Sequence, residues 1–301
     1  MMTMEYHNPV LLSESVSGLN IKPNGVYVDV TFGGGGHSRE ILKQLGPDGK
    51  LFAFDQDTDA LANTINDDRF VLINQNFRFI KRFLRFHNIK SVDGILADLG
   101  VSSHQFDVPE RGFSTRFDAD LDMRMNQNDA LNAYKVVNEY DEPNLKRVFL
   151  EFGELKNAGA IASTILASRE SQPIKTTDEL KEVLSQFLPA KFSNKILAQM
   201  YQAIRIEVNQ EIDVLKEFLT QSLEILNVGG RLSVISYHSL EDRLVKRFMK
   251  NGLFDGEPEK DFFGNFSVPF KNVQKLIVPN QQEVAKNNRA RSAKLRIAEK
   301  K

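Results

Sequence analysis

The sequence predicts an α/β protein in which an open, mostly parallel sheet is interrupted by a helical insertion. Short apolar segments alternate with helical stretches through residues 1–104, and the same alternation returns after residue 204. Strands that alternate with helices form right-handed crossovers, which leave the strands parallel. Residues 105–204 contain no convincing strand pattern. We therefore expect a split domain, 1–104 and 205–301, and an inserted, mostly helical domain, 105–204.

The first part of the chain predicts four strands separated by helices. Its apolar run Leu51–Phe54 suits a strand that is covered on both faces of the sheet. The phenylalanines of the last helix recur at helical spacing, which favours a helix that covers the sheet over a surface that stacks on RNA bases. The expected strands are Val26–Thr31, Leu51–Asp55, Phe70–Asn74 and Gly94–Leu99, and the expected helices are Ser38–Leu45, Asp59–Asn66 and Phe77–His87.

The last part of the chain predicts a long amphipathic helix and the remaining strands. The helix covers Asn209–Leu226, and a pair of glycines is expected to stop it before the strand Arg231–Ser236. Two late strands, Lys275–Val278 and Lys294–Ala298, are expected to complete the sheet as a hairpin-like edge.

Composition excludes several kinds of metal and redox site. The chain has no cysteine, which excludes disulfide bonds, thiolate zinc sites and cysteine nucleophiles. The five histidines are too far apart to offer the spacing of helical metal ligands. Asp118, Asp120 and Asp122 are similar to the start of a calcium loop, but Met123 occupies the position that needs glycine. We therefore expect no metal.

Hydropathy and charge bear on location and partners. No apolar run approaches the roughly 20 residues of a membrane span, and the start of the chain lacks the pattern of a signal peptide. We therefore expect a soluble, cytoplasmic protein. The formal net charge of −1 neither requires nor excludes nucleic acid, because basic residues can cluster within a neutral total.

A glycine-rich turn follows the first predicted strand and opens the first helix. Four glycines, residues 33–36, precede His37. Backbone N–H groups of such a turn can approach a ligand at the N-terminus of the helix. In a doubly wound sheet, nucleotide-like ligands bind at this first turn. Asp55 ends the next strand, where its carboxylate is placed to accept both ribose hydroxyls of such a ligand.

Three features favour S-adenosylmethionine over a nicotinamide cofactor. Ser38 stands where the dinucleotide fingerprint has its last glycine. An acid, Asp29, leads into the turn, which is more typical of S-adenosylmethionine sites. The helix–glycine–glycine–strand pattern of 226–232 is common before the fifth strand of class I methyltransferases. The alternatives are a nicotinamide-dependent oxidoreductase on the same sheet and a non-enzymatic RNA-binding assembly factor.

Further candidates follow the fourth and fifth strands. Asp98 ends the fourth strand, and the carboxyl ends of strands face the ligand crevice in an open α/β sheet. Residues 238–242 follow the fifth strand and are placed to line a base pocket. Glu241 and Asp242 are equally expected as first-turn acids of a helix, where the helix dipole favours them. From Lys286 onward basic residues dominate, and their alternation over 294–297 favours a basic face that neutralises phosphates.

A series of short motifs resembles one family over nearly the whole chain. The motifs are Gly35–Ser38, Asp93–Leu96, Asp98–Ser103, Arg111–Ser114, Leu121–Met125, Gln202–Ile206, Val208–Asn209, His238–Arg243 and Arg289–Ser292. On these residues the chain resembles the bacterial ribosomal RNA small subunit methyltransferase H family. The resemblance implies a class I (Rossmann-like) methyltransferase fold with an inserted helical domain that recognises the substrate.

The resemblance also implies an activity and a partner. Members transfer a methyl group from S-adenosylmethionine to the exocyclic amine, N(4), of a cytidine in 16S rRNA, at cytidine 1402 in the decoding centre. The partner is then 16S rRNA within the small ribosomal subunit, while a monomer and a homodimer both stay open.

Individual residues receive roles by matching the family's motifs. The residues implied for S-adenosylmethionine are Gly34, Gly35, Gly36, His37, Asp55, Phe77, Asp98 and Gln105, with Phe77 beside the adenine. Asp98 is also the catalytic candidate, because it or the carbonyl groups of 99–102 would accept the amine hydrogens. The substrate-binding candidates are Tyr237, His238, Ser239, Arg289 and Arg291, with Tyr237 or Phe113 as the aromatic that stacks on the base. Tyr237 departs from the family's usual phenylalanine, and His104 from the proline that usually precedes Gln105.

Overall fold

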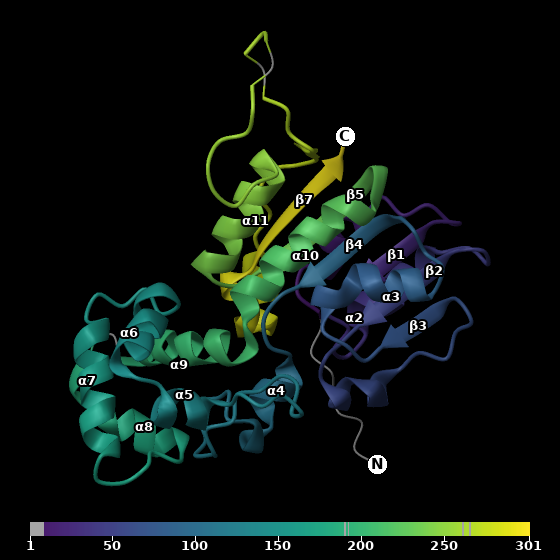
Figure 1. Ribbon diagram of the computed structural model, residues 1–301. Helices are drawn as coiled ribbons and strands as arrows, with labels where there is room; N and C mark the ends of the chain where they lie inside the picture. The colour runs from purple at the N-terminus through teal and green to yellow at the C-terminus, as the bar shows by residue number, and fades with distance from the viewer. Residues whose placement is uncertain (1–8, 190, 192, 261, 265) are drawn as a thin grey trace. The chain divides into compact units, whose positions relative to one another are not determined.

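A computed structural model describes residues 9–189, 191, 193–260, 262–264 and 266–301 (Figure 1). The chain forms two compact units, one built from Met1–Gly100 with Ile212–Lys301 and the other from Val101–Glu211. The expected boundaries at 104/105 and 204/205 differ from these because helices cross them: α4 covers Ser103–Asp107 and α9 covers Ser193–Asn209. Residues 1–8 of the expected first segment lie outside the described residues.

The split unit contains a seven-stranded sheet with the order β3-β2-β1-β4-β5-β7-β6. Strands β1 to β5 run parallel, and β7 runs antiparallel between β5 and β6. A dinucleotide-binding sheet has the order 3-2-1-4-5-6, without the inserted antiparallel strand. The predicted open, Rossmann-like α/β sheet is confirmed. The strands are β1 (Val26–Asp29), β2 (Lys50–Phe54), β3 (Phe70–Ile73), β4 (Val92–Asp98), β5 (Leu226–Ser236), β6 (Phe270–Asn272) and β7 (Lys294–Lys300).

Helices cover both faces of this sheet, as the apolar strands predict. One core places α3, α10 and α11 against the sheet through side chains such as Leu84, Phe218 and Val245. The other core places α1 and α2 on the opposite face through side chains such as Val16 and Ile41. The helices are α1 (Leu12–Gly18), α2 (Gly36–Gln44), α3 (Ile80–Phe86), α10 (Glu211–Ile225), α11 (Ser239–Asn251) and α12 (Gln281–Lys286).

Two expected strands differ from the observed ones. The strand that follows α10 starts at Leu226, so the glycine pair lies inside β5 rather than before it. Gly229 has a φ of 79°, and the pairing of β5 with β4 shifts register there, so the pair forms an irregularity that only glycine adopts easily. Of the expected strand Lys275–Val278, only Ile277 forms a bridge, to Leu295. The strand that pairs with β7 on the side away from β5 is β6.

Shorter elements also differ from expectation. The predicted helix Asp59–Asn66 is a 3-10 turn, Thr58–Asn63, and two more 3-10 turns cover Phe77–Phe79 and Asn288–Ser292. Arg78 and Lys81 at the start of α3 form ion pairs with Glu217 and Glu224 of α10. The charges of Arg78 and Lys81 are therefore compensated within the fold, and α3 is the predicted sheet-covering helix.

The unit 101–211 is helical. Its core gathers apolar side chains of α5, α6, α7 and α9, including Val136, Phe149, Ile161 and Ile204. The helices not yet given are α5 (Ala133–Glu139), α6 (Glu142–Glu151), α7 (Ala158–Arg169) and α8 (Thr177–Val183), with 3-10 turns at Pro109–Arg111 and Ser185–Phe187. In the part of the chain that the structure describes, no helix combines the length and apolar character of a membrane span.

The acidic loop of this unit, which contains Asp118, Asp120 and Asp122, is held by side-chain hydrogen bonds. Arg124 contacts both carboxylate oxygens of Asp122. The side chain of Asn209 accepts a hydrogen bond from Met125 N at 2.7 Å and donates one to Met123 O at 2.8 Å. Both methionines are buried, so they dock the loop onto α9.

Candidate active site

The glycine turn between β1 and α2 has a backbone that other residues adopt only with strain. Gly33 and Gly35 have φ values of 49° and 76°. A Cβ atom on Gly36 would lie 2.1 Å from Pro9 Cγ. Helix α2 starts at Gly36 without a side-chain cap among the described residues. Its first N–H groups have no partner within the helix, which makes this end suited to an anionic ligand group.

Two buried polar side chains brace the turn from behind. Asp29 accepts hydrogen bonds from Thr31 N at 3.1 Å and from Ser38 Oγ at 2.6 Å. Burial raises the pKa of Asp29, while these bonds act in the opposite direction. The serine that replaces the last fingerprint glycine is therefore the partner of the acid that leads the turn. Both residues support the turn from within the protein.

Asp55 connects the glycine turn to the carboxyl end of β2. Its Oδ2 accepts a hydrogen bond from Gly33 N at 2.7 Å, and its Oδ1 accepts one from Asp57 N at 2.9 Å. Burial raises the pKa of Asp55 to about 6. A carboxylate oxygen can accept more than one hydrogen bond. The geometry therefore leaves Asp55 able to accept hydroxyl groups as well as hold the turn.

Asp98 lies at the end of β4, where side chains from two other elements converge. Its Oδ1 accepts a hydrogen bond from the Tyr237 hydroxyl at 2.7 Å, and its Oδ2 lies 3.9 Å from His37 Nδ1. Its backbone N–H donates to Thr31 Oγ1 at 2.7 Å. Burial raises the pKa of Asp98 to about 6, although the hydrogen bond from the Tyr237 hydroxyl acts in the opposite direction.

The tautomer of His37 follows from its other contact. His37 Nε2 lies 3.2 Å from the carbonyl oxygen of Val10, which can only accept, so Nε2 carries the hydrogen. Burial lowers the pKa of His37, which keeps the ring neutral. Its Nδ1 is then an acceptor that faces the Asp98 carboxylate, a second acceptor. Two facing acceptors 3.9 Å apart form a site for a ligand that brings hydrogen-bond donors.

The hydrogen bond from Tyr237 to Asp98 is a contact within the candidate site that the sequence does not predict. The Tyr237 hydroxyl donates to Asp98, and the side chain packs against a buried cluster that includes Val10 and Ile235. That Tyr237 or Phe113 stacks on the base stays a prediction. The available signal was topological: Tyr237 follows β5, and β5 pairs with β4, which ends at Asp98.

His238 and Glu241 build the start of α11. Glu241 Oε2 accepts a hydrogen bond from Tyr237 N at 2.9 Å, and His238 caps the helix as half of a capping box. Asp242 binds Arg296 and Lys294 at 2.7 and 3.2 Å. The alternative of first-turn acids thus describes Glu241 and Asp242, and Ser239 is the exposed first residue of the helix.

The remaining predicted residues are spread over other elements. Phe77 is partly buried, with its ring edge against Phe218 at a centroid distance of 5.2 Å. Gln105 lies in the helical unit, where it is buried and forms a capping box with Ser102. Arg289 and Arg291 lie in the 3-10 turn before β7, anchored by the buried Ala290, so the basic segment is folded rather than a solvated tail.

Comparisons with known proteins place the sequence in one family. The model of the MraW methylase family matches residues 4–301. A protein named Ribosomal RNA small subunit methyltransferase H from Flavobacterium johnsoniae is 76% identical over 298 residues, which cover 99% of each chain. Proteins of the same name from Christiangramia forsetii and Bacteroides thetaiotaomicron are 67% and 55% identical, over 100% and 99% of this chain and 99% and 98% of theirs. By sequence over almost its whole length, the chain belongs to the MraW methylase family.

Proposed function

We propose that the protein transfers a methyl group from S-adenosylmethionine to the N(4) amine of a cytidine in 16S rRNA of the small ribosomal subunit, at cytidine 1402 as the family resemblance implies. The family membership and the names of the relatives support rRNA methylation. The observation that carries the choice of an amine is the pair of facing acceptors, Asp98 Oδ2 and His37 Nδ1.

The residues around the glycine turn fit S-adenosylmethionine. When bound, this cofactor supplies an electrophilic methyl group on a cationic sulfur. The uncapped start of α2 suits the carboxylate of its methionine part. Asp55 suits the ribose hydroxyls, because both of its oxygens keep acceptor capacity. Phe77 offers a partly exposed ring to the adenine.

A nicotinamide cofactor fits the same turn poorly. Ser38 fills the last fingerprint position and is bonded to Asp29. The antiparallel β7 also separates β5 from β6, unlike in the dinucleotide-binding order. Together with membership of a methylase family, these features favour methyl transfer over hydride transfer.

The acceptor pair suits the difficult part of the reaction. A cytosine amine is a poor nucleophile because its lone pair is delocalised into the ring. Acceptors on its two hydrogens favour a pyramidal nitrogen with a localised lone pair, and Asp98 and His37 offer one acceptor each. Holding the amine in line with the methyl group can lower the barrier by up to about 7–11 kcal/mol in ideal cases.

The amine must also lose a proton as it gains the methyl group. Asp98 is placed to receive that proton, because its pKa of about 6 leaves it ionised at neutral pH yet more basic than an ordinary aspartate. His37 Nδ1 accepts a hydrogen bond from the other amine hydrogen, since the Nε2 hydrogen is donated to Val10 O and the ring stays neutral. Tyr237 keeps the carboxylate oriented through Oδ1.

We further propose that residues 105–204 recognise the RNA. The support is the connectivity of the chain. The helical segment is inserted after β4, which ends in Asp98. The chain then returns to the sheet through α10 and β5, and β5 leads to Tyr237.

Methyl transfer and cofactor binding test the function together. Cells with and without the gene are compared by nucleoside mass spectrometry of 16S rRNA, and the purified protein is assayed for transfer of labelled methyl groups to small subunits. We expect N(4)-methylcytidine only with the active gene. RNA binding without methyl transfer would favour the assembly-factor alternative. Thermal stabilisation by a nicotinamide cofactor but not by S-adenosylmethionine would favour the oxidoreductase.

A further inference from the structure

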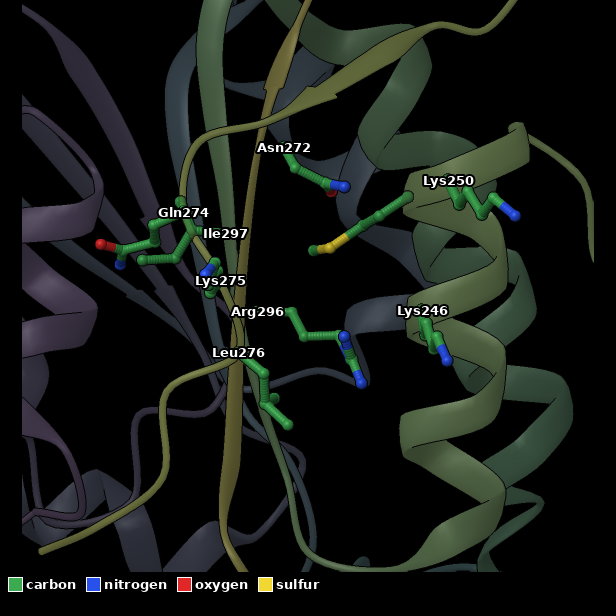
Figure 2. Close-up of a pocket in the computed structure, with 9 residues that line it drawn as sticks. Lys246, Lys250, Asn272, Gln274, Lys275, Leu276, Arg296 and Ile297 are labelled. Atoms are coloured by element: carbon green, nitrogen blue, oxygen red, sulfur yellow. The ribbon is translucent and has the colours of Figure 1, made fainter.

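A small pocket on the split unit has a strongly basic lining. It has a volume of about 150 Å³ and lies between α11 and the edge formed by β6, β7 and the segment between them. The charged lining residues are Lys246, Lys250, Lys275 and Arg296, and none of the described residues that line the pocket carries a carboxylate. Figure 2 shows Arg296 and Asn272 extending from the strand side toward α11, which carries the first two lysines.

The charges of the three lysines are not compensated in the described part of the chain. Arg296 is held by Asp242 at 2.7 Å, which fixes the position of its guanidinium. Lys246, Lys250 and Lys275 are exposed, and none of them forms an ion pair with a described residue. Arg78 and Lys81 near the start of α3 differ, because acids of α10 pair with both of them.

Two of these lysines share one face of α11. Lys246 and Lys250 are four residues apart, so they repel each other. Lys250 also lies in the last turn, where the helix dipole favours a positive charge. A bound anion would remove the repulsion between the two lysines.

The third lysine is held by the backbone on both sides. Val273 N donates to Ile297 O at 3.2 Å, and Ile277 exchanges two hydrogen bonds with Leu295 at 3.1 and 2.9 Å. These bonds fasten the segment between β6 and α12 along β7, with Lys275 between the two points of attachment. Its charge is thus brought to the pocket before any ligand binds, which lowers the entropic cost of binding.

We propose that this pocket binds backbone phosphates of the RNA substrate, beside the target nucleotide. The proposal rests on the proposed function. Lysines bind phosphate as point charges. The apolar residues that line the pocket, Met249, Leu276 and Ile297, suit contact with the sugar of the same backbone. The pocket is smaller than the roughly 300–1,000 Å³ of sites for drug-sized ligands, which favours single phosphate groups.

The position of the pocket suits an RNA strand that continues from the candidate active site. Helix α11 starts two residues after Tyr237, which contacts Asp98. At about 1.5 Å per residue, Lys246 and Lys250 lie roughly 10 and 17 Å along the helix from its start. A strand with its target base near Asp98 would therefore pass these lysines with neighbouring phosphates.

The test measures RNA affinity as a function of salt. A fluorescent oligoribonucleotide that spans the target cytidine is titrated with the protein by anisotropy between 0.1 and 1 M KCl. The variant is K246Q/K250Q/K275Q, and the matched control is K22Q/K50Q/K90Q, three exposed lysines before or at the starts of β1, β2 and β4. K246R/K250R/K275R keeps the charges. Binding of S-adenosylmethionine reports that each variant is folded.

Three phosphate contacts at about 0.7 each in a single strand predict that the salt slope falls by about 2 in the glutamine variant. With equal affinity at 1 M KCl, this variant then binds about 100-fold more weakly at 0.1 M KCl. The arginine variant and the control are expected to keep the wild-type slope. An unchanged slope in the glutamine variant, or an equal loss in the control, overturns the proposal.

Two further outcomes are also decisive. If the triple glutamine variant does not bind S-adenosylmethionine, the single Lys→Gln variants replace it, each with an expected fall in slope of about 0.7. Unchanged salt slopes in all three single variants again overturn the proposal that the pocket binds phosphate. Absence of methyl transfer by the wild-type protein, with the salt effect intact, would contradict the proposed reaction and leave the phosphate site standing.

Discussion

Asp55 and Asp98 occupy equivalent places on either side of β1, but different kinds of group hold them. They follow or end β2 and β4, the two strands that pair with β1, and burial raises the pKa of both to about 6. Backbone N–H groups, including that of Gly33, hold Asp55. The side chain of Tyr237 holds Asp98, and the ring of His37 faces it.

With the proposed roles, we expect this difference to separate cofactor binding at Asp55 from chemistry at Asp98. Asp55 is part of the hydrogen bonding that shapes the glycine turn, so a change there alters the fold of the cofactor site. The side-chain partner of Asp98 can be removed without changing the backbone. We therefore expect substitutions at Asp55 to affect affinity and stability together, and substitutions around Asp98 to affect turnover.

The largest effect is expected for Asp98→Asn. Asparagine keeps an oxygen for the Tyr237 hydroxyl, but it removes the charge and the base that faces His37. General-base groups contribute typically 10²–10⁴-fold, so we expect kcat to fall by about that factor, with a melting temperature close to that of the wild type. Steady-state methyl transfer measures kcat, with Asp68→Asn, an exposed aspartate, as control. Turnover within threefold of the wild type would contradict the role.

Acidification is expected to affect both carboxylates at once. Their raised pKa of about 6 means that each binds a proton well above the pH at which an ordinary aspartate does, and the acceptor is lost as the pH falls through 6. At pH 5 roughly a tenth of each remains ionised. If both are needed, kcat/KM at pH 5 is about 100-fold lower than at pH 8. An acid limb with its midpoint near 4, the ordinary value, would contradict this prediction.

Asp55→Asn should have a smaller effect, and on different quantities. The amide NH₂ must face either Gly33 N–H or Asp57 N–H, so one donor loses its acceptor. An unpaired buried donor costs about 1–3 kcal/mol. We expect a lower melting temperature and S-adenosylmethionine affinity reduced roughly tenfold, measured by thermal unfolding and calorimetry. Asp48→Asn, in an exposed turn, is the control. Normal affinity and stability with reduced kcat would reverse the assignment of the two aspartates.

The sequence predicts the features of the two carboxylate sites that depend only on residues close together in the chain. A few consecutive residues are enough to identify the end of a strand or a run of glycines. The sequence therefore predicts that the glycine turn, Asp55 and Asp98 lie at the carboxyl ends of their strands. The same locality explains the sheet-covering α3, whose apolar spacing is helical.

The parts that were missed depend on contacts between distant segments. The Tyr237–Asp98 bond joins residues 139 positions apart and requires β5 to pair with β4. The tautomer of His37 depends on a carbonyl group, that of Val10, which no side-chain pattern reveals. The sequence predicts an edge strand at 275–278, whereas the strand at the edge of the sheet is β6, Phe270–Asn272, which pairs with β7.

The smallest effect is expected for Tyr237→Phe, and it tests the side-chain half of the comparison. The hydroxyl donates to the ionised Asp98 and therefore lowers the pKa of that carboxyl group. Its loss should raise the pKa above 6 and move the acid limb of the kcat profile to higher pH. Activity would then fall severalfold at pH 6 but little at pH 8. Tyr27→Phe also loses a buried hydroxyl, which accepts from Lys22 N at 2.8 Å, but it does not touch Asp98. If both variants lose activity equally at all pH values, the hydroxyl of Tyr237 serves stability alone, whereas a shift confined to Tyr237→Phe shows that it tunes the base.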